Sequence, residues 1–129
     1  MQALLTTHFP TYELFFCDEA EPFIAWLRSN LAETLFISLD HDLELKPTGD
    51  GRWYDPGTGR MVADYLATCA PVCPIIIHST NRDAVIGMEM LLQESGWSVD
   101  IVTPYGDLVW VGESWWPAVQ RAAILMSEP

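Results

Sequence analysis

The chain has 129 residues, half of them hydrophobic, and its 18 acidic and 6 basic side chains give a formal net charge of −12 at neutral pH. This length is typical of one domain, so we expect residues 1–129 to fold as a single domain, and the apolar content excludes a disordered chain. The acidic balance excludes an extended nucleic-acid surface, and no apolar stretch is long enough to span a membrane.

Two strands and one helix are predicted in the first third of the chain. The short aromatic run at residues 12–17 has the composition of a strand. A helical stripe of apolar residues begins behind Asp18, which stands three residues before Glu21 as in a capping box. Residues 34–39 are the second predicted strand. The polar segment 44–56, rich in Gly and Pro, is expected to be a mobile loop that covers the functional site.

The second half of the chain repeats the alternation of helix and strand. A helix is expected to open at Thr58, and the run at residues 74–77 is apolar on both faces, as central parallel strands are. The next helix is ended by Gly96, residues 98–102 form the fourth predicted strand, and Ser114 can cap the last helix. This order predicts an α/β fold, an open and mostly parallel sheet of about four strands with helices packed on it.

The three cysteines indicate the compartment. Cys17, Cys69 and Cys73 form no CxxC pair and have apolar neighbours. Because the amino terminus lacks the pattern of a secretion signal, they are expected to be buried thiols in a reducing environment. We therefore expect a cytoplasmic protein without membrane contact.

Polar residues follow all four predicted strands, where open parallel sheets bind their ligands. Two of the three histidines, His41 and His78, stand behind successive strands, so we expect them in one cleft as a base and acid pair. A single histidine at such a place more commonly has a structural role. Asp18 is most simply a helix cap, and Asp42 and Asn81 can stabilise turns. The four polar groups are Asp18-Glu19, Asp40-His41-Asp42, His78-Ser79-Thr80-Asn81 and Thr103-Pro104-Tyr105.

Four of the six cations lie in the segments that leave these strand ends, namely Lys46, Arg52, Arg60 and Arg82. Such gathering in an acidic chain favours a local anion site, to which the amino terminus of the helix at Thr58-Gly59 can add. The alternative is that these cations only offset nearby aspartates.

Two further features have competing interpretations. Asp40, His41, Asp42 and His78 offer ligands suited to a divalent metal, although adjacent side chains of an extended segment point to opposite sides. The aromatic C-terminal segment is expected to pack against the sheet. Its aromatic rings could instead stack on a base, and Tyr105 is the best candidate for such a ligand contact because it follows a strand end.

Three motifs in this order resemble the cyclic-phosphate processing receiver-like domain family. They are Ser38-Leu39-Asp40-His41-Asp42-Leu43, Thr58-Gly59-Arg60-Met61-Val62 and Ile77-His78-Ser79-Thr80-Asn81. The resemblance covers roughly residues 12–119 and implies a receiver-like (flavodoxin-like) fold. Asp40, His41 and Asp42 match the family's first motif. Thr58 and Gly59 match the pair that opens a helix, and His78, Ser79 and Asn81 match the last motif.

The chain departs from this family in two places. Members normally begin with a strand that ends in an acidic pair, whereas residues 1–9 resemble the tail of the helix after it, so the domain is expected to be shortened at its amino end. The open sheet edge then leaves room for pairing with a neighbouring segment or a second subunit, as in a homodimer. Pro104-Tyr105 stands where receivers carry a lysine, which argues against phosphotransfer signalling.

The resemblance and the residues together predict a phosphoesterase that acts on a cyclic phosphate, either a 2′,3′-cyclic RNA end or a small cyclic nucleotide, without a cofactor. The alternatives are a receiver-like domain that binds a cyclic nucleotide or a protein without catalysis, and a metal-dependent hydrolase. The expected catalytic residues are His41, His78, Asp40 and Asp42. The expected substrate-binding residues are Thr58, Gly59, Arg60, Ser79, Thr80, Asn81, Arg82 and Tyr105.

Overall fold

The computed structural model describes residues 1–41 and 45–127. Helices and strands alternate along most of the chain, as the sequence predicts. The α-helices are α1 (Gln2–His8), α2 (Ala20–Asn30), α3 (Gly59–Ala67), α4 (Arg82–Glu94) and α5 (Trp116–Ser127). The strands are β1 (Ile37–Leu39), β2 (Lys46–Pro47), β3 (Trp53–Tyr54), β4 (Ile75–His78) and β5 (Val99–Val102). A 3-10 turn, η1 (Leu31–Glu33), and a π-helical turn, η2 (Val111–Trp115), complete them.

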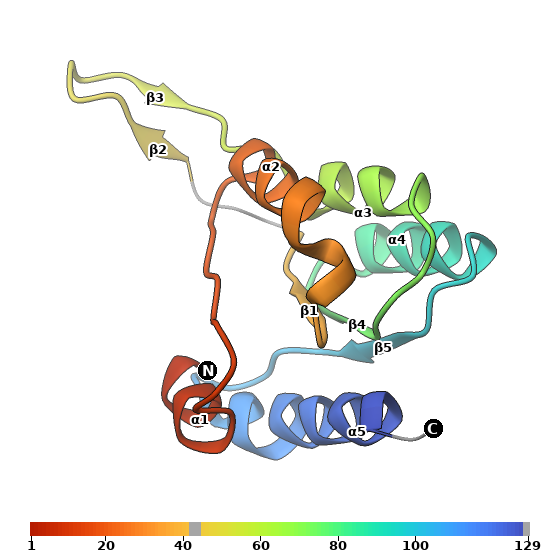
Figure 1. Cartoon of the computed structure of the whole chain (residues 1–129). Helices are drawn as coiled ribbons and strands as arrows, with labels where there is room; N and C mark the ends of the chain where they lie inside the picture. Colours follow the sequence, from red (N-terminus) through yellow and green to blue (C-terminus); the bar gives the residue numbers. More distant parts are fainter. Residues whose placement is uncertain (42–44, 128–129) are drawn as a thin grey trace.

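The main sheet is parallel and has the order β1-β4-β5. It lies between two layers of helices, with α2, α3 and α4 on one face and α1 and α5 on the other (Figure 1). Strand β4 is central, and its side chains alternate between the two cores. Ile75 and Ile77 pack under α2, α3 and α4, whereas Ile76 packs under α1 and α5. All three are fully buried, which confirms the prediction of a central strand with two apolar faces.

The sheet has three parallel strands because residues 12–17 form no strand, so this part of the prediction is wrong. Their side chains still alternate in a strand-like way. Leu14 packs on the core under α1 and α5, while Phe15 stacks on Phe23 and Trp26 of α2. Among the described residues, however, no backbone hydrogen bond joins residues 13–17 to another strand. The segment therefore has the pattern of a strand without a neighbour to pair with.

The polar segment after β1 is a β-hairpin rather than an irregular loop. Lys46 and Pro47 pair antiparallel with Tyr54 and Trp53, and a turn with positive φ at Gly49 and Gly51 joins them. The hairpin projects beyond α2 (Figure 1). Its tethers are an ion pair between Lys46 and Asp18 and hydrogen bonds from Tyr54 to Glu19 and from Ala20 N–H to the Pro56 carbonyl oxygen, at 2.8 Å in the last case.

Two predicted helix caps are wrong. Helix α2 has Glu19 at its N-cap, and Asp18 instead pairs with Lys46, whose hydrogen bond lowers the pKa of the Asp18 carboxyl. Ser114 lies inside η2, which runs directly into α5. In contrast, Asn81 does cap α4, since its side-chain oxygen accepts a hydrogen bond from the Ala84 N–H at 3.2 Å.

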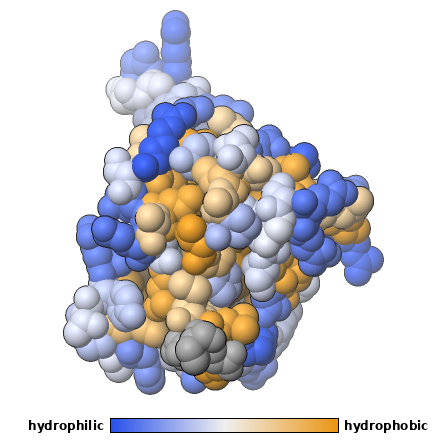
Figure 2. Space-filling view, turned by 45° about the vertical axis from the view of Figure 1, so that its right-hand side comes forward, coloured by the Kyte–Doolittle hydropathy of each residue, from blue (hydrophilic) through white to orange (hydrophobic). Residues whose placement is uncertain are grey.

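On one face of the molecule, apolar residues gather in the middle, among hydrophilic ones (Figure 2). Exposed large apolar side chains include Ile124 and Leu125 of α5. No helix among the described residues is long and apolar enough to cross a membrane. All three cysteines are free, and burial raises the pKa of the Cys73 thiol to about 12.

Candidate functional site

The register of the sheet brings Asp40 and His78 together. Leu39 of β1 pairs with Ile77 of β4, so Asp40, which follows β1, lies beside His78, the last residue of β4. The imidazole of His78 is half-buried and packs against the Trp110 ring, with 5.6 Å between ring centroids. Burial lowers the pKa of His78 below its ordinary value of 6.5, and the nearby Asp40 charge partly opposes this shift. His78 is therefore a neutral imidazole near neutral pH, a form that can accept a proton.

The amino terminus of α3 lies directly against the end of β1. The Gly59 N–H donates a hydrogen bond to the His41 carbonyl oxygen at 3.0 Å. A Cβ atom on Gly59 would stand 2.1 Å from the Asp40 carbonyl oxygen and 3.0 Å from the His41 Cα. Only glycine permits this approach, which places the positive end of the α3 dipole beside Asp40 and His41. Thr58 is the N-cap residue of α3 and makes no side-chain capping bond.

The segment after β4 is a tight polar turn. Ser79 is buried, and its hydroxyl oxygen accepts a hydrogen bond from the Asn81 N–H at 3.1 Å. Asn81 in turn caps α4, while Thr80 and Arg82 are exposed. Ser79 and Asn81, both predicted to bind substrate, thus fix the direction in which the chain leaves β4 and enters α4.

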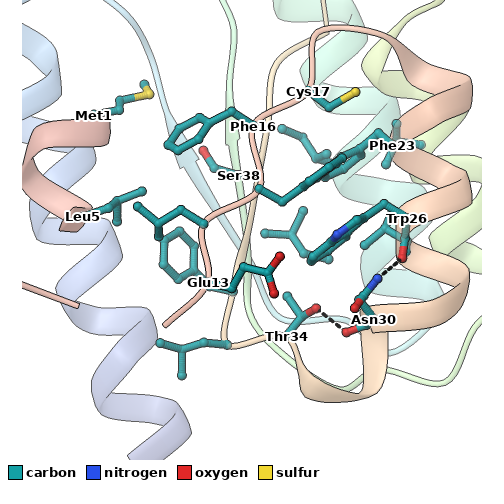
Figure 3. Close-up of a pocket in the computed structure, with 18 of the residues that line it drawn as sticks. Met1, Leu5, Glu13, Phe16, Cys17, Phe23, Trp26, Asn30, Thr34 and Ser38 are labelled. Atoms are coloured by element: carbon teal, nitrogen blue, oxygen red, sulfur yellow. Dashed lines mark hydrogen bonds between the residues drawn. The ribbon is translucent and has the colours of Figure 1, made fainter. Parts of the chain in front are cut away.

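A cavity of about 460 Å³ runs along the free side of β1, between this strand and residues 11–17. Its walls come from both cores (Figure 3), with Leu5 on the α1 side and Phe23 and Trp26 on the α2 side. We call it the edge cavity. Asp40, Gly59 and His78 line one end, next to the carboxyl ends of the strands, and Asn30, Glu33 and Thr34 line the other. A volume of this size is typical of small-molecule sites.

None of the four predicted cations, all of which the structure describes, lines the edge cavity, and two of them pair with carboxylates elsewhere. Lys46 pairs with Asp18, and Arg60 pairs with Asp64 one helical turn further along α3, with 2.9 Å between Arg60 Nε and Asp64 Oδ1. For these two residues the interpretation as charge compensation fits the structure better. Arg82, the first residue of α4, follows the His78 turn directly.

The other predicted residues either do not line the edge cavity or lie outside the residues that the structure describes. Tyr105 donates a hydrogen bond to Glu113 at 2.6 Å, which raises the pKa of its phenol, and it does not line the cavity. No described residue of the hairpin lines the cavity either. Among the described side chains, no group of three or more His, Cys, Asp or Glu could hold a metal ion. Asp42, a predicted catalytic residue, lies outside the described residues.

Two features of the site were not predicted. The contact between Trp110 and His78 joins residues 32 positions apart, and the sequence indicated only that Trp110 packs in the core. The stack of Phe15 on Trp26, with centroids 4.5 Å apart, forms part of the cavity wall. The signal in the sequence is the aromatic composition of residues 12–17, which predicts a strand and not a cavity wall.

Residues 7–94 match the family model described as the cyclic-phosphate processing receiver domain. No significant match is found among curated proteins or among solved structures. The matched region contains α2, β1, α3, β4 and α4, and with them Asp40, Gly59 and His78, whereas Trp110, which packs on His78, lies beyond it.

Proposed function

This chain belongs to the cyclic-phosphate processing receiver domain family, and on that premise we propose that it hydrolyses a cyclic phosphate at the carboxyl ends of β1 and β4. The observation that carries the proposal is the pair formed by Asp40 and a neutral His78 at one end of the edge cavity. Proposed substrates are a 2′,3′-cyclic phosphate at an RNA end and a small cyclic nucleotide.

In the proposed reaction, His78 is the general base. It takes a proton from water as the water oxygen bonds to phosphorus, and the bond from phosphorus to one ribose oxygen breaks. His41 then gives a proton to that leaving oxygen, so the product is an acyclic phosphate monoester. The lowered pKa of His78 supports its role as the base, because the imidazole must be neutral before it can accept the proton.

The same arrangement offers positive charge that can bind the phosphate. The amino termini of α3 and α4 both point to this edge of the sheet, and Arg82 stands at the first position of α4. Backbone N–H groups and an arginine are the usual partners of phosphate oxygens. The proposed part of Asp40 is to orient the imidazole of His78, which its charge influences.

The test is turnover of 2′,3′-cyclic nucleotides by two single variants, the corresponding double variant and one control variant. His41→Gln and His78→Gln should each lower kcat/KM by ~10²-fold or more. The double variant should lose little more, because groups that act as one unit are not additive. His8→Gln is the control, since His8 ends α1, packs on Trp116 and is not among the residues that line the edge cavity. Turnover that survives in the double variant would contradict the proposal.

A second candidate is binding without hydrolysis. No Lys or Arg occurs among the described residues that line the edge cavity, which favours a ligand held by apolar contacts over one held by its phosphate. Folded wild-type protein that binds a cyclic nucleotide without turning it over would support this candidate. Loss of turnover on addition of a chelator would instead support a metal-dependent hydrolase.

A further inference from the structure

The sheet has an open edge at β1. Among the described residues, β1 has a neighbouring strand on one side only, where the Ile37 N–H donates to the Pro74 carbonyl oxygen at 3.1 Å. Backbone groups of successive strand residues point to alternate sides, so the N–H and C=O of Ser38 point away from β4. An edge of this kind is a template for a further strand, and backbone groups away from water need a partner.

Residues 13–17 form the opposite wall of the edge cavity. They are extended, and their side chains alternate between the two cores, with Leu14 on the α1 side and Phe15 on the α2 side. Phe16 again points to the α1 side (Figure 3). Both long walls of the cavity therefore consist of strand-like backbone. The space between them suits a group that offers hydrogen bonds to both sides and apolar side chains to both faces.

The charge of the lining indicates the chemistry of such an occupant. Four acidic residues, Glu13, Glu19, Glu33 and Asp40, line the edge cavity, and no Lys or Arg is found among its described lining residues. The whole chain carries −12, so a second copy is repelled by the first. An occupant that complements the acidic and apolar lining of the edge cavity is an apolar segment with cationic side chains beside it.

We propose that the edge cavity binds an extended peptide segment, apolar in its centre and flanked by Lys or Arg. This segment adds a strand between residues 13–17 and β1. Recognition of this kind takes affinity from main-chain hydrogen bonds and specificity from side-chain pockets. The proposal does not depend on hydrolysis, because it requires only the open backbone of β1, the strand-like wall and the acidic lining.

The probe is a synthetic peptide of five alternating valine and isoleucine residues with two lysines at each end. Calorimetric titration should give saturable one-to-one binding, and hydrogen exchange of the Ser38 amide should slow at least ~10-fold when the peptide is present. The same peptide with N-methyl groups at alternate positions keeps its side chains and loses half of its donors. Equal affinity for this peptide would overturn strand addition in favour of simple apolar binding.

Charge variants test the second half of the proposal. Glu13 is exposed, so Glu13→Lys should fold normally and weaken binding of the lysine-flanked peptide about fivefold. Glu94→Lys makes the same change at an exposed position of α4 that does not line the edge cavity, and should leave the affinity unaltered. A glutamate-flanked peptide that binds as well as the lysine-flanked one, or no binding at about 1 mM, would refute the proposal. A stable homodimer that the probe does not dissociate would assign the cavity to a second copy.

Discussion

The close contact of Gly59 with the end of β1 gives the sharpest prediction, because two physical effects of Gly59→Ala have opposite signs. Alanine is the better helix former, so a glycine-to-alanine change in a helix ordinarily stabilises a protein by up to ~1 kcal/mol. Gly59 is the first residue of α3 and does not have a positive φ. Propensity alone therefore predicts a more stable protein.

Packing predicts the reverse result. The new Cβ would stand 2.1 Å from the Asp40 carbonyl oxygen and 2.9 Å from its carbonyl carbon, and neither atom can move without the backbone. Overpacking of this kind costs about 1–3 kcal/mol, and loss of the Gly59 hydrogen bond to His41 adds about 1 kcal/mol. After subtraction of the propensity gain of about 1 kcal/mol, we expect Gly59→Ala to lower the free energy of unfolding by about 1–3 kcal/mol.

Gly87→Ala is the matched control. Gly87 lies inside α4, and its added Cβ would meet only Arg60 Nη1, at 3.0 Å, which is the end of a flexible side chain. This variant should be more stable than wild type by about 0.5–1 kcal/mol. Urea unfolding followed by tryptophan fluorescence measures both values, with an unchanged m-value as the sign of an unchanged fold. If Gly59→Ala is as stable as Gly87→Ala, the close approach of α3 to β1 is not a constraint and the reasoning fails.

Three further predictions concern other parts of the molecule. Because burial lowers the pKa of His78, the unfolded chain binds a proton more readily below pH 6.5. The free energy of unfolding should therefore fall as the pH drops below that value, and this dependence should be weaker in His78→Gln when both are compared by urea unfolding. Cys73, with its pKa raised to about 12, should react with a thiol reagent far more slowly than Cys17 in the folded protein, and equal rates on peptide mapping would contradict its burial. Trp115 Nε1 donates to Ser38 Oγ at 3.0 Å, so a double-mutant cycle of Trp115→Phe and Ser38→Ala should give a coupling energy of about 1 kcal/mol, and additive effects would exclude this bond.

Burial patterns could be predicted from the sequence, whereas strand partners could not. The run at residues 74–77 is apolar on both faces, and β4 is indeed the central strand. Residues 12–17 show an equally clear alternation and line the two cores as expected, yet they form no strand. A strand is defined by hydrogen bonds to a neighbour, and the space between this segment and β1 is the edge cavity. No property of residues 12–17 themselves reveals that absence.

The hairpin shows how the same residues permit two interpretations. Gly49 and Gly51 predict a break in regular structure, but their positive φ angles form the turn that lets residues 46–47 pair with residues 53–54. The Thr48 N–H donates to the Arg52 carbonyl oxygen at 3.0 Å across this turn. Glycine marks a place where the chain reverses, and only the flanking residues decide whether a pair of strands follows.

The positions of the site residues could be predicted from the sequence, but the directions of their side chains could not. The rule that ligands bind at the carboxyl ends of parallel strands selected Asp40 and His78, which the register then places side by side. The direction of a long side chain depends on its nearest counter-charge, which explains the outcome for Arg60. Asp64 follows it by four residues on the same helix, a spacing that favours an ion pair, and Arg60 pairs there.

Asp40 connects the proposed catalytic site with the proposed strand site. Its negative charge raises the pKa of His78 against the effect of burial, and Asp40 also lines the edge cavity. A lysine or arginine of a bound segment placed near Asp40 would offset that charge, so burial would act on His78 with less opposition. The pKa of His78 should then fall further, which keeps the imidazole neutral over a wider pH range. Occupation of the edge cavity would in this way tune the base of the proposed reaction through the charge of Asp40.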